Sequence, residues 1–323
     1  MLLFRAFDAI LPERIIAVAF WGHMRWKLRI GVLGLVAFLS CAPGPGMMAR
    51  HIRTLKEELL FQINRDRTRY GLPPLRWDKR AARVAEAHCR EMLREKYFSH
   101  WDLSGRKPYQ RYALAGGTEY NAENLGFAFY LPSGPGDHIN VRRAVFESYR
   151  EMLAEKPPDD GHRRTILNPY HTHVGIGLAF DVDRVYIAQL FLSRYIAFRP
   201  SPPQRARLEE GKICLSGKLL KKGYSLDRIQ VFHESLPRPL SPRELDRLPR
   251  WYGLPEEKVE LQPLLPPHKH YRDGSRGEIE IKGDRFRCPV PFFDGPGVYT
   301  VVAFLKDAKG NIFPATEVCI EVK

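Results

Sequence analysis

A proline-rich segment, RPSPPQR at residues 199–205, divides the 323-residue chain into two parts with different hydrophobic periods. Apolar residues before it recur mostly at the spacing of amphipathic helices, whereas those after it alternate as in half-buried strands. Because prolines stiffen a chain and interrupt regular structure, we expect a linker here. The sequence therefore predicts two domains, over residues 51–196 and 205–323, joined by a linker at residues 197–204.

The first part predicts helices first and strands late. Long helices are expected over residues 51–70, 79–96 and 138–154, and shorter ones in KPYQRYALAGG and GHRRTILNPYH. The stretch NAENLG is expected to be a loop. Two strands follow, HVGIGLAFD and RVYIAQLFL, separated by a turn. This order is typical of an α+β domain.

The second part predicts a small β-sandwich of the immunoglobulin-like type. Its expected strands are KICLSGKLL, RIQVFHE, GEIEIKG, FRCPVPF, GVYTVVAFLKD and TEVCIEV, separated by Gly, Pro or Asp turns. A proline-rich segment at residues 236–273 lies between two of these strands, and it is expected to be a surface insertion.

The N-terminal region predicts export. The apolar run IGVLGLVAFLS ends immediately before Cys41 and follows the basic stretch MRWKLR, so it suits a signal sequence and is too short for a stable membrane anchor. Residues 1–41 resemble a bacterial lipoprotein signal with lipid on Cys41, followed by a flexible tether at residues 42–50. This resemblance implies a protein that is exported and held at the bacterial cell envelope by its lipid. A secretory signal cleaved near Ala42 is the alternative, and the start at Met1 or Met24 is left open.

The net charge of +14 and the isoelectric point of about 9.6 favour an anionic partner. Nucleic acid, an anionic membrane and a cell-wall surface all fit that description. No helix-turn-helix, zinc-finger spacing or RNA-binding aromatic motif accompanies the charge, so nucleic acid is disfavoured.

Four cysteines remain besides Cys41, and an exported chain can oxidise them. Their pairing is not readable from the sequence. No CxxC motif supports a thioredoxin-like or zinc-ribbon site. The four are Cys89, Cys214, Cys288 and Cys319.

Two histidines and two acids in the first part are candidates for chemistry: His100, Glu123, Glu151 and His162. Two imidazoles and two carboxylates can hold a divalent metal, and neutral imidazole nitrogen suits zinc. They can also exchange protons, because burial and neighbouring charges shift the pKa values of both group types. The spacing alone does not join them into one site.

The segment from about Leu55 to Leu192 resembles the CAP superfamily, or SCP domain, of cysteine-rich secretory and pathogenesis-related proteins, especially its bacterial secreted branch. The resemblance rests on five ordered motifs: INRDRTRYGLPPLRWD, AEAHCREMLREKYFSH, AENLG, GHRRTILNPYHTHVGIGLAF and YIAQLF. It implies an α-β-α sandwich with a cleft.

The resemblance also implies a cavity lined by His100, Glu123 and His162. Glu151 on the third long helix takes the role of the second acid, with Glu147 as the alternative, because the connection to GHR is longer here than in bacterial members. The other histidines are interpreted as core packing at His88, as surface or loop-bracing residues at His171 and His173, with the cleft rim as the alternative, and as a solvated loop at His268 and His270.

The resemblance does not imply one activity, since members have been linked to sterol or fatty-ligand binding, cell-wall association and proteolysis. GxSxG, HExxH and Cys-His signatures are absent. We expect a cell-envelope protein that binds an apolar molecule or a glycan in its cleft, with zinc as the metal if one is used. The alternatives are a metal-dependent hydrolase using the same cleft and a structural protein that binds anionic cell-wall polymer. Whether the protein is an enzyme is left open.

Overall fold

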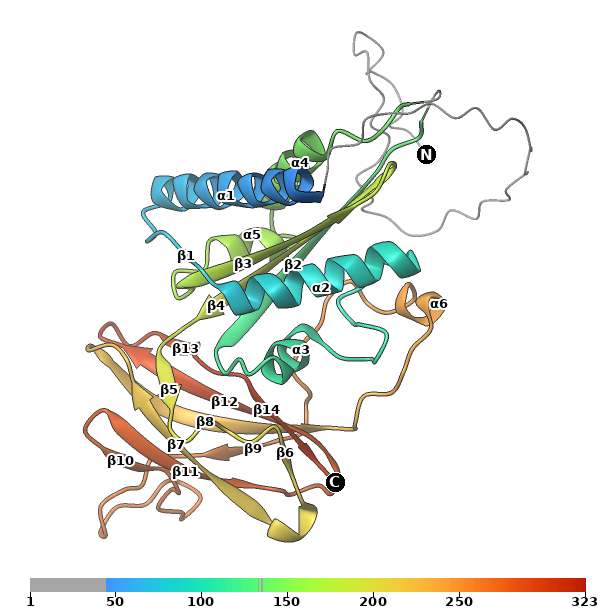
Figure 1. The fold of residues 1–323 in the computed structure, drawn as a ribbon. Helices are drawn as coiled ribbons and strands as arrows, with labels where there is room; N and C mark the ends of the chain where they lie inside the picture. The colour runs from blue at the N-terminus through green and yellow to red at the C-terminus, as the bar shows by residue number, and fades with distance from the viewer. Residues whose placement is uncertain (1–44, 133, 135) are drawn as a thin grey trace, which may run out of the picture.

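The computed structural model describes residues 45–323 except 133 and 135, and its first domain is a three-layer sandwich. The central sheet runs in the order β1-β3-β4-β2, with bounds Arg76–Trp77, His173–Phe180, Arg184–Ser193 and Tyr120–Phe129. Figure 1 shows helices on both faces of this sheet. One face carries α1 (Pro45–Arg69), α4 (Val141–Ala154) and α5 (Gly161–Ile166); the other carries α2 (Lys79–Glu95) and α3 (Pro108–Leu114).

Two apolar cores lie on either side of the sheet. On one side the stripe Leu55, Leu59 and Ile63 of α1 is buried against α4 and the sheet, as its helical spacing predicts. On the other side α2 lies very close to β3. A Cβ on Gly175 would lie 2.1 Å from the backbone nitrogen of Ala82, so the small residues on both elements permit this approach.

Two segments differ from the expected structure. Helix α1 begins at Pro45, so residues 45–50 of the predicted tether are helical; proline suits a first helical position, and Met and Ala are good helix formers. The predicted loop NAENLG lies inside β2, where its polar side chains are buried but hydrogen-bonded. The predicted signal segment and Cys41 lie outside the described residues.

The second domain consists of two packed sheets. One has the order β10-β11-β7-β5, with bounds Glu280–Lys282, Arg285–Pro291, Lys212–Leu219 and Ile196–Phe198. The other has the order β6-β14-β12-β8-β9, with bounds Arg205–Ala206, Val318–Val322, Gly297–Asp307, Tyr224–Glu234 and Lys258–Leu261, and β13 (Ile312–Pro314) pairs with β12. Alternate side chains of both sheets form one core. The predicted α+β class with a C-terminal β-sandwich is confirmed, while the immunoglobulin-like type stays a prediction.

The two domains share an interface. Strand β5, at the start of the predicted linker, already pairs with β7 of the second domain. The backbone N–H of Tyr120 donates to the carbonyl of Ala315 at 3.1 Å. The rings of Tyr170 and Phe313 stack with their centroids 3.9 Å apart. These polar and aromatic contacts join the edge of the first domain to the second.

The four cysteines of the described chain are free thiols. Cys89 and Cys288 are buried, and burial raises the pKa of each thiol. Within residues 45–323 no helix has the length and apolar character that a bilayer span requires.

Candidate functional site

His100 and Glu123 meet on the face of the sheet that carries α2. Helix α2 ends at Lys96 in a left-handed conformation, and the turn that follows brings His100 back to the sheet. Glu123 projects from β2 toward it, and His100 Nδ1 lies 3.0 Å from Glu123 Oε1. Both side chains are buried, so the contact is shielded from water.

Arg111 of α3 completes this cluster. Its Nη2 donates to Glu123 Oε2 at 2.8 Å, and its Nη1 donates to the backbone carbonyl of His100 at 2.5 Å. Burial opposes ionisation of Glu123, but Arg111 and His100 outweigh it and hold the pKa of Glu123 at about 2. Burial lowers the pKa of His100, although Glu123 acts in the opposite direction. The cluster therefore contains an ionised Glu123–Arg111 pair beside a neutral imidazole.

His162, at the start of α5, contacts Glu155 and β2. Its Nδ1 contacts Glu155 Oε1 at 2.5 Å, and its backbone N–H donates to Glu155 Oε2 at 2.9 Å. Asn124 Nδ2 donates to the carbonyl of His162 at 3.1 Å. Because Glu123 and Asn124 are consecutive on an edge strand, they point to opposite faces. His100 is thus bonded to one residue of this edge strand through its side chain and His162 to the next through its backbone carbonyl, and, in addition to burial, His162 contributes to lowering the pKa of His100.

Glu155, rather than Glu151, is the acid that contacts His162. Glu151 is exposed on α4, and Glu147 pairs with Arg143 at 2.9 Å on the same helix. Glu155 is the residue that caps the end of α4, which brings it to the start of α5. The sequence offered one indication of Glu155: the connection between α4 and the GHR motif is long and includes this acid seven residues before His162.

Carboxylates orient the two histidines among the predicted metal ligands. In both His100 and His162 a carboxylate holds Nδ1, which is the pattern that orients zinc-binding imidazoles through their other nitrogen. The described residues contain one group of three such ligand atoms within 4.8 Å of one another, and it lies in the second domain. Metal binding by the predicted tetrad stays a prediction.

A segment of the second domain covers His100. We call residues 238–253, within the predicted insertion, the strap. The Tyr252 hydroxyl accepts the backbone N–H of Glu123 at 2.8 Å, and its ring lies 4.8 Å from that of His100, centroid to centroid. Burial raises the pKa of Tyr252 well above its usual value, so the hydroxyl stays protonated. Sequence reasoning missed this residue, because its hydrogen-bond partner Glu123 lies 129 positions away.

Several further contacts fix the strap to the first domain. Leu245, in the short helix α6 (Pro242–Leu245), is fully buried in the core beside α2, and Figure 1 shows α6 next to that helix. Asp246 Oδ1 accepts the N–H of Phe98 at 3.1 Å. Arg250 donates to the Phe98 carbonyl and lies over the Phe98 ring. The first half of the predicted surface insertion is therefore part of the first domain's core and covers His100.

The remaining histidines mostly have structural partners. His88 is buried, as predicted for core packing, and its Nε2 contacts the Ser99 carbonyl at 2.9 Å. His171 is buried against Ser193 rather than at the surface, with 3.0 Å between Nδ1 and Oγ. His173 is partly buried beside Arg194. His268 and His270 are exposed in the second half of the insertion, as expected.

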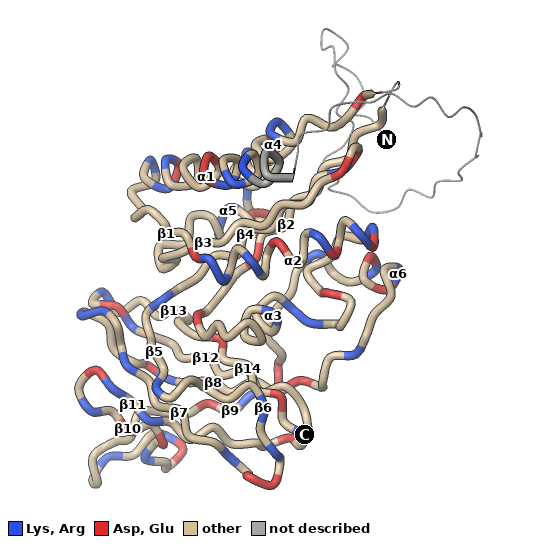
Figure 2. The backbone as a smooth tube through the Cα atoms, in the orientation of Figure 1, with Lys and Arg blue, Asp and Glu red and all other residues tan. Residues whose placement is uncertain are grey.

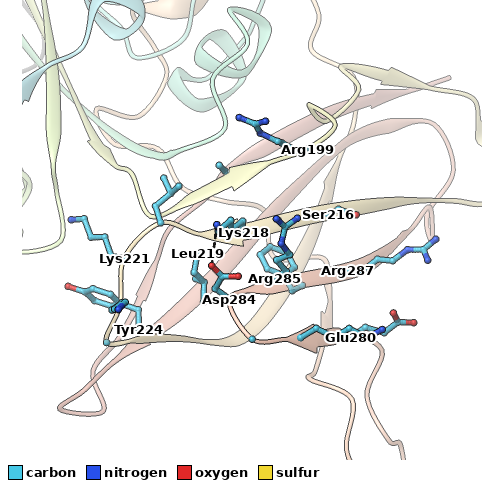
Figure 3. Close-up of a pocket in the computed structure, with 18 residues that line it drawn as sticks. Arg199, Ser216, Lys218, Leu219, Lys221, Tyr224, Glu280, Asp284, Arg285 and Arg287 are labelled. Atoms are coloured by element: carbon cyan, nitrogen blue, oxygen red, sulfur yellow. Dashed lines mark ion pairs between the residues drawn. The ribbon is translucent and has the colours of Figure 1, made fainter.

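A basic groove lies on the outer face of sheet β10-β11-β7-β5 in the second domain, with a volume of about 1220 Å³ (Figure 3). Arg285 and Arg287 point outward from β11 because the residues that alternate with them are buried. Two acids also line the groove, Glu280 and Asp284. Its basic residues are Arg199, Lys218, Lys221, Lys222, Lys282, Arg285 and Arg287.

The groove brings like charges together. Lys218 and Arg285 are directly opposite each other on neighbouring strands, an arrangement that costs stability in a sheet. Lys218 pairs with Asp284 at 3.4 Å, whereas the other six basic residues have no carboxylate within ion-pair distance in the described chain. Figure 2 shows Lys and Arg on α1 and α2 as well, so the groove concentrates a charge that is otherwise widely spread.

Comparisons with known proteins find relatives of the first domain. The model of the CAP, or cysteine-rich secretory protein, family matches residues 60–193. The uncharacterized membrane protein YlbC of Bacillus subtilis is 29% identical over 142 residues, which are 44% of this chain and 35% of that protein. The uncharacterized protein YkwD of the same organism is 27% identical over 126 residues, 39% of this chain and 43% of that protein. The chain thus spans less than half the length of either relative.

Solved structures give weaker matches. An extracellular SCP-domain protein from Bacillus anthracis has a TM-score of 0.38 and 24% identity, covering 48% of this chain and 45% of its own. An outer surface protein of Borrelia burgdorferi has a TM-score of 0.34 and 20% identity, covering 44% of this chain and 93% of its own. The family match and the ordered motifs together identify the first domain: residues 60–193 form a CAP domain of the cysteine-rich secretory protein family.

Proposed function

We propose that the protein is an exported envelope protein that binds an anionic polymer through the basic groove of its second domain. The observation that carries this proposal is the set of six groove cations without a carboxylate partner in the described chain. A polymer rich in phosphate or carboxylate would supply the missing charge and offset the repulsion between Lys218 and Arg285. The apolar run before Cys41 and the match to a family of secretory proteins support an envelope location.

The test is a fluorescence-anisotropy titration with labelled poly(glycerol phosphate). The groove variant carries Arg285→Ala and Arg287→Ala. The control variant carries Arg53→Ala and Arg83→Ala, which removes the same charge from exposed positions on α1 and α2. Binding should weaken at least about tenfold in the groove variant, the effect of losing roughly 1.4 kcal/mol, and stay near wild type in the control. Equal losses in both would mean that net charge alone binds the polymer.

A second candidate function is ligand or zinc binding between His100 and His162, the site predicted from the sequence. The carboxylates on both Nδ1 atoms favour it, because they orient the two rings. Tyr252 covers His100, so the strap would have to move for a ligand to enter. Zinc calorimetry on wild type, His100→Ala and His162→Ala tests this candidate. Unchanged binding in both variants would exclude the site, and hydrolysis that survives chelation would exclude a metal-dependent hydrolase.

Membrane attachment through Cys41 is a separate proposal. It rests on the apolar run that precedes this residue and the basic stretch before that run. Expression in a bacterium with a labelled fatty acid tests it. Labelling should be lost in Cys41→Ser, and a variant that labels as strongly as wild type would exclude lipid at this position.

A further inference from the structure

We propose that His233, Glu257 and Asp294 form a divalent-metal site in the second domain. Their ligand atoms all lie within 4.8 Å of one another. His233 is near the end of β8, Glu257 immediately precedes β9, and Asp294 lies in the turn between β11 and β12. Three segments that are distant in sequence therefore converge on one point. The site is separate from both the CAP cleft and the basic groove.

The imidazole of His233 is held in one orientation. It is buried, and its ring packs against that of Tyr299 with 4.8 Å between centroids. A Cβ on Gly297 would lie 2.2 Å from His233 Nε2, so the ring packs directly against the backbone of Gly297, where no side chain would fit. His233 Nε2 lies 3.3 Å from the carbonyl oxygen of Pro296. Because a carbonyl only accepts hydrogen bonds, this contact fits the tautomer with its hydrogen on Nε2, which leaves Nδ1 free to bind a metal ion.

The other ring nitrogen faces two acids. His233 Nδ1 lies 2.8 Å from Asp294 Oδ2 and 3.9 Å from Glu257 Oε2. Carboxylate oxygens also only accept hydrogen bonds, so a hydrogen on Nδ1 or a metal ion bound to Nδ1 suits this arrangement. One imidazole and two carboxylates are ligands that zinc accepts, and an imidazole whose second N–H donates to a carbonyl is typical of metal sites.

Backbone contacts place the two acids. The N–H of His233 donates to the Glu257 carbonyl at 3.1 Å, which fixes Glu257 beside the ring. The N–H of Asp294 donates to the Tyr299 hydroxyl at 2.9 Å, and that hydroxyl donates to the Gly295 carbonyl at 2.9 Å. Ligand atoms around a tetrahedral zinc lie about 3.3 Å apart, so each carboxylate needs to shift by only about an ångström. Both are exposed and can make that shift.

The site lies where the strap returns to the second domain. Glu257 follows Tyr252 by five residues, and Glu234, next to His233, accepts hydrogen bonds from Lys107, Tyr109 and Gln110 of the first domain. A metal bound here would link the end of the strap to the β11–β12 turn. It would thereby help to hold Tyr252 over the CAP cleft.

Equilibrium dialysis of the full-length chain against zinc tests the proposal. Asp294→Asn and Glu257→Gln remove one ligand each at exposed positions, and Glu256→Gln removes a neighbouring exposed charge as the matched control. Each ligand variant should bind one zinc at least about tenfold more weakly than wild type, while Glu256→Gln binds as wild type does. His100→Ala should leave this zinc in place, which separates the site from the CAP cleft.

Two results would overturn the proposal. One is a wild-type protein that takes up no zinc at neutral pH. The other is zinc uptake that is the same in wild type, Asp294→Asn and Glu257→Gln. Limited trypsin digestion gives a second readout. Zinc should slow cleavage at Arg247 and Arg250 in wild type and in Glu256→Gln but not in Asp294→Asn; equal cleavage with and without zinc in wild type would count against the link to the strap.

Discussion

The hydroxyl oxygen of Tyr252 accepts the backbone N–H of Glu123 at 2.8 Å, so a residue of the second domain caps the edge strand of the first. Two residues earlier on β2, the N–H of Asn121 donates to Glu317 of the second domain at 2.8 Å. An exposed edge strand presents unpaired backbone groups and is prone to wrong pairing. The second domain therefore protects the edge of the CAP sheet at the point where the candidate cleft lies.

Replacing Tyr252 should destabilise the protein around Glu123. In Tyr252→Phe the N–H of Glu123 loses its acceptor, and we expect a loss of about 1 kcal/mol in the free energy of unfolding. Hydrogen exchange at the Glu123 amide should become faster. Urea denaturation and exchange measured by NMR check both effects. Trp251→Phe, at an exposed neighbouring position, is the control, and a Tyr252→Phe protein as stable and protected as this control would show that the strap does not cap β2.

Removing Arg111 should lower the free energy of unfolding far more than removing the Tyr252 hydroxyl. Arg111→Met leaves the carboxylate of Glu123 buried without its cation, and breaking a buried pair in this way costs about 3–5 kcal/mol. The double variant Arg111→Met, Glu123→Gln should recover part of that loss, because no buried charge remains. Urea denaturation of the three proteins gives the comparison. A double variant less stable than Arg111→Met alone would contradict the charge argument.

Stability should fall as the pH drops below about 6.5, the ordinary pKa of histidine. Burial lowers the pKa of His88 to about 3 and of His171 to about 3, and it also lowers the pKa of His100. Because these folded-state values lie below the unfolded value, the unfolded chain binds more protons, and the stability present above a pH of about 6.5 is lost on acidification. Each histidine contributes up to about 1.4 kcal/mol per pH unit. Urea unfolding between a pH of about 7.5 and about 5 measures the slope. In His88→Leu the slope of stability against pH should correspond to about one proton fewer taken up on unfolding. An unchanged slope would show that His88 titrates normally in the folded state.

Limited trypsin digestion should cut the second half of the insertion before the strap. Lys269 and Arg272 are exposed in a loop without regular structure, whereas Arg250 in the strap is bonded to the first domain. We therefore expect the first fragments to end near residues 269–276. Mass spectrometry of the early fragments identifies the sites. First cuts at Arg247 or Arg250 would mean that the strap leaves the first domain readily.

The sequence predicted the helices and strands well where apolar residues follow one period over many positions, as in α1, α2 and β12. A loop was expected at NAENLG. The structure instead buries these residues in β2, where partners from other elements satisfy them. Local propensity carries no information about such distant partners.

The sequence predicted only part of the candidate site, because several of its residues act through contacts between distant parts of the chain. His100, Glu123 and His162 follow from the ordered CAP motifs, and the structure places them around one strand edge. The sequence did not predict a role for Glu155, Arg111 or Tyr252, because each acts through a contact that exists only in the folded chain. The strap in particular is visible in the sequence only as a proline-rich interruption between strands.

The most direct test of the proposed function is the salt dependence of polymer binding. Wild type and the Arg285→Ala, Arg287→Ala variant are titrated with poly(glycerol phosphate) at about 50 mM and about 300 mM salt, a range over which the screening length falls from roughly 14 to roughly 6 Å. If the basic groove holds the polymer, wild-type affinity should fall steeply over this range and the variant should start weaker and fall less. Affinities that are the same in the two proteins at both salt concentrations would contradict the account.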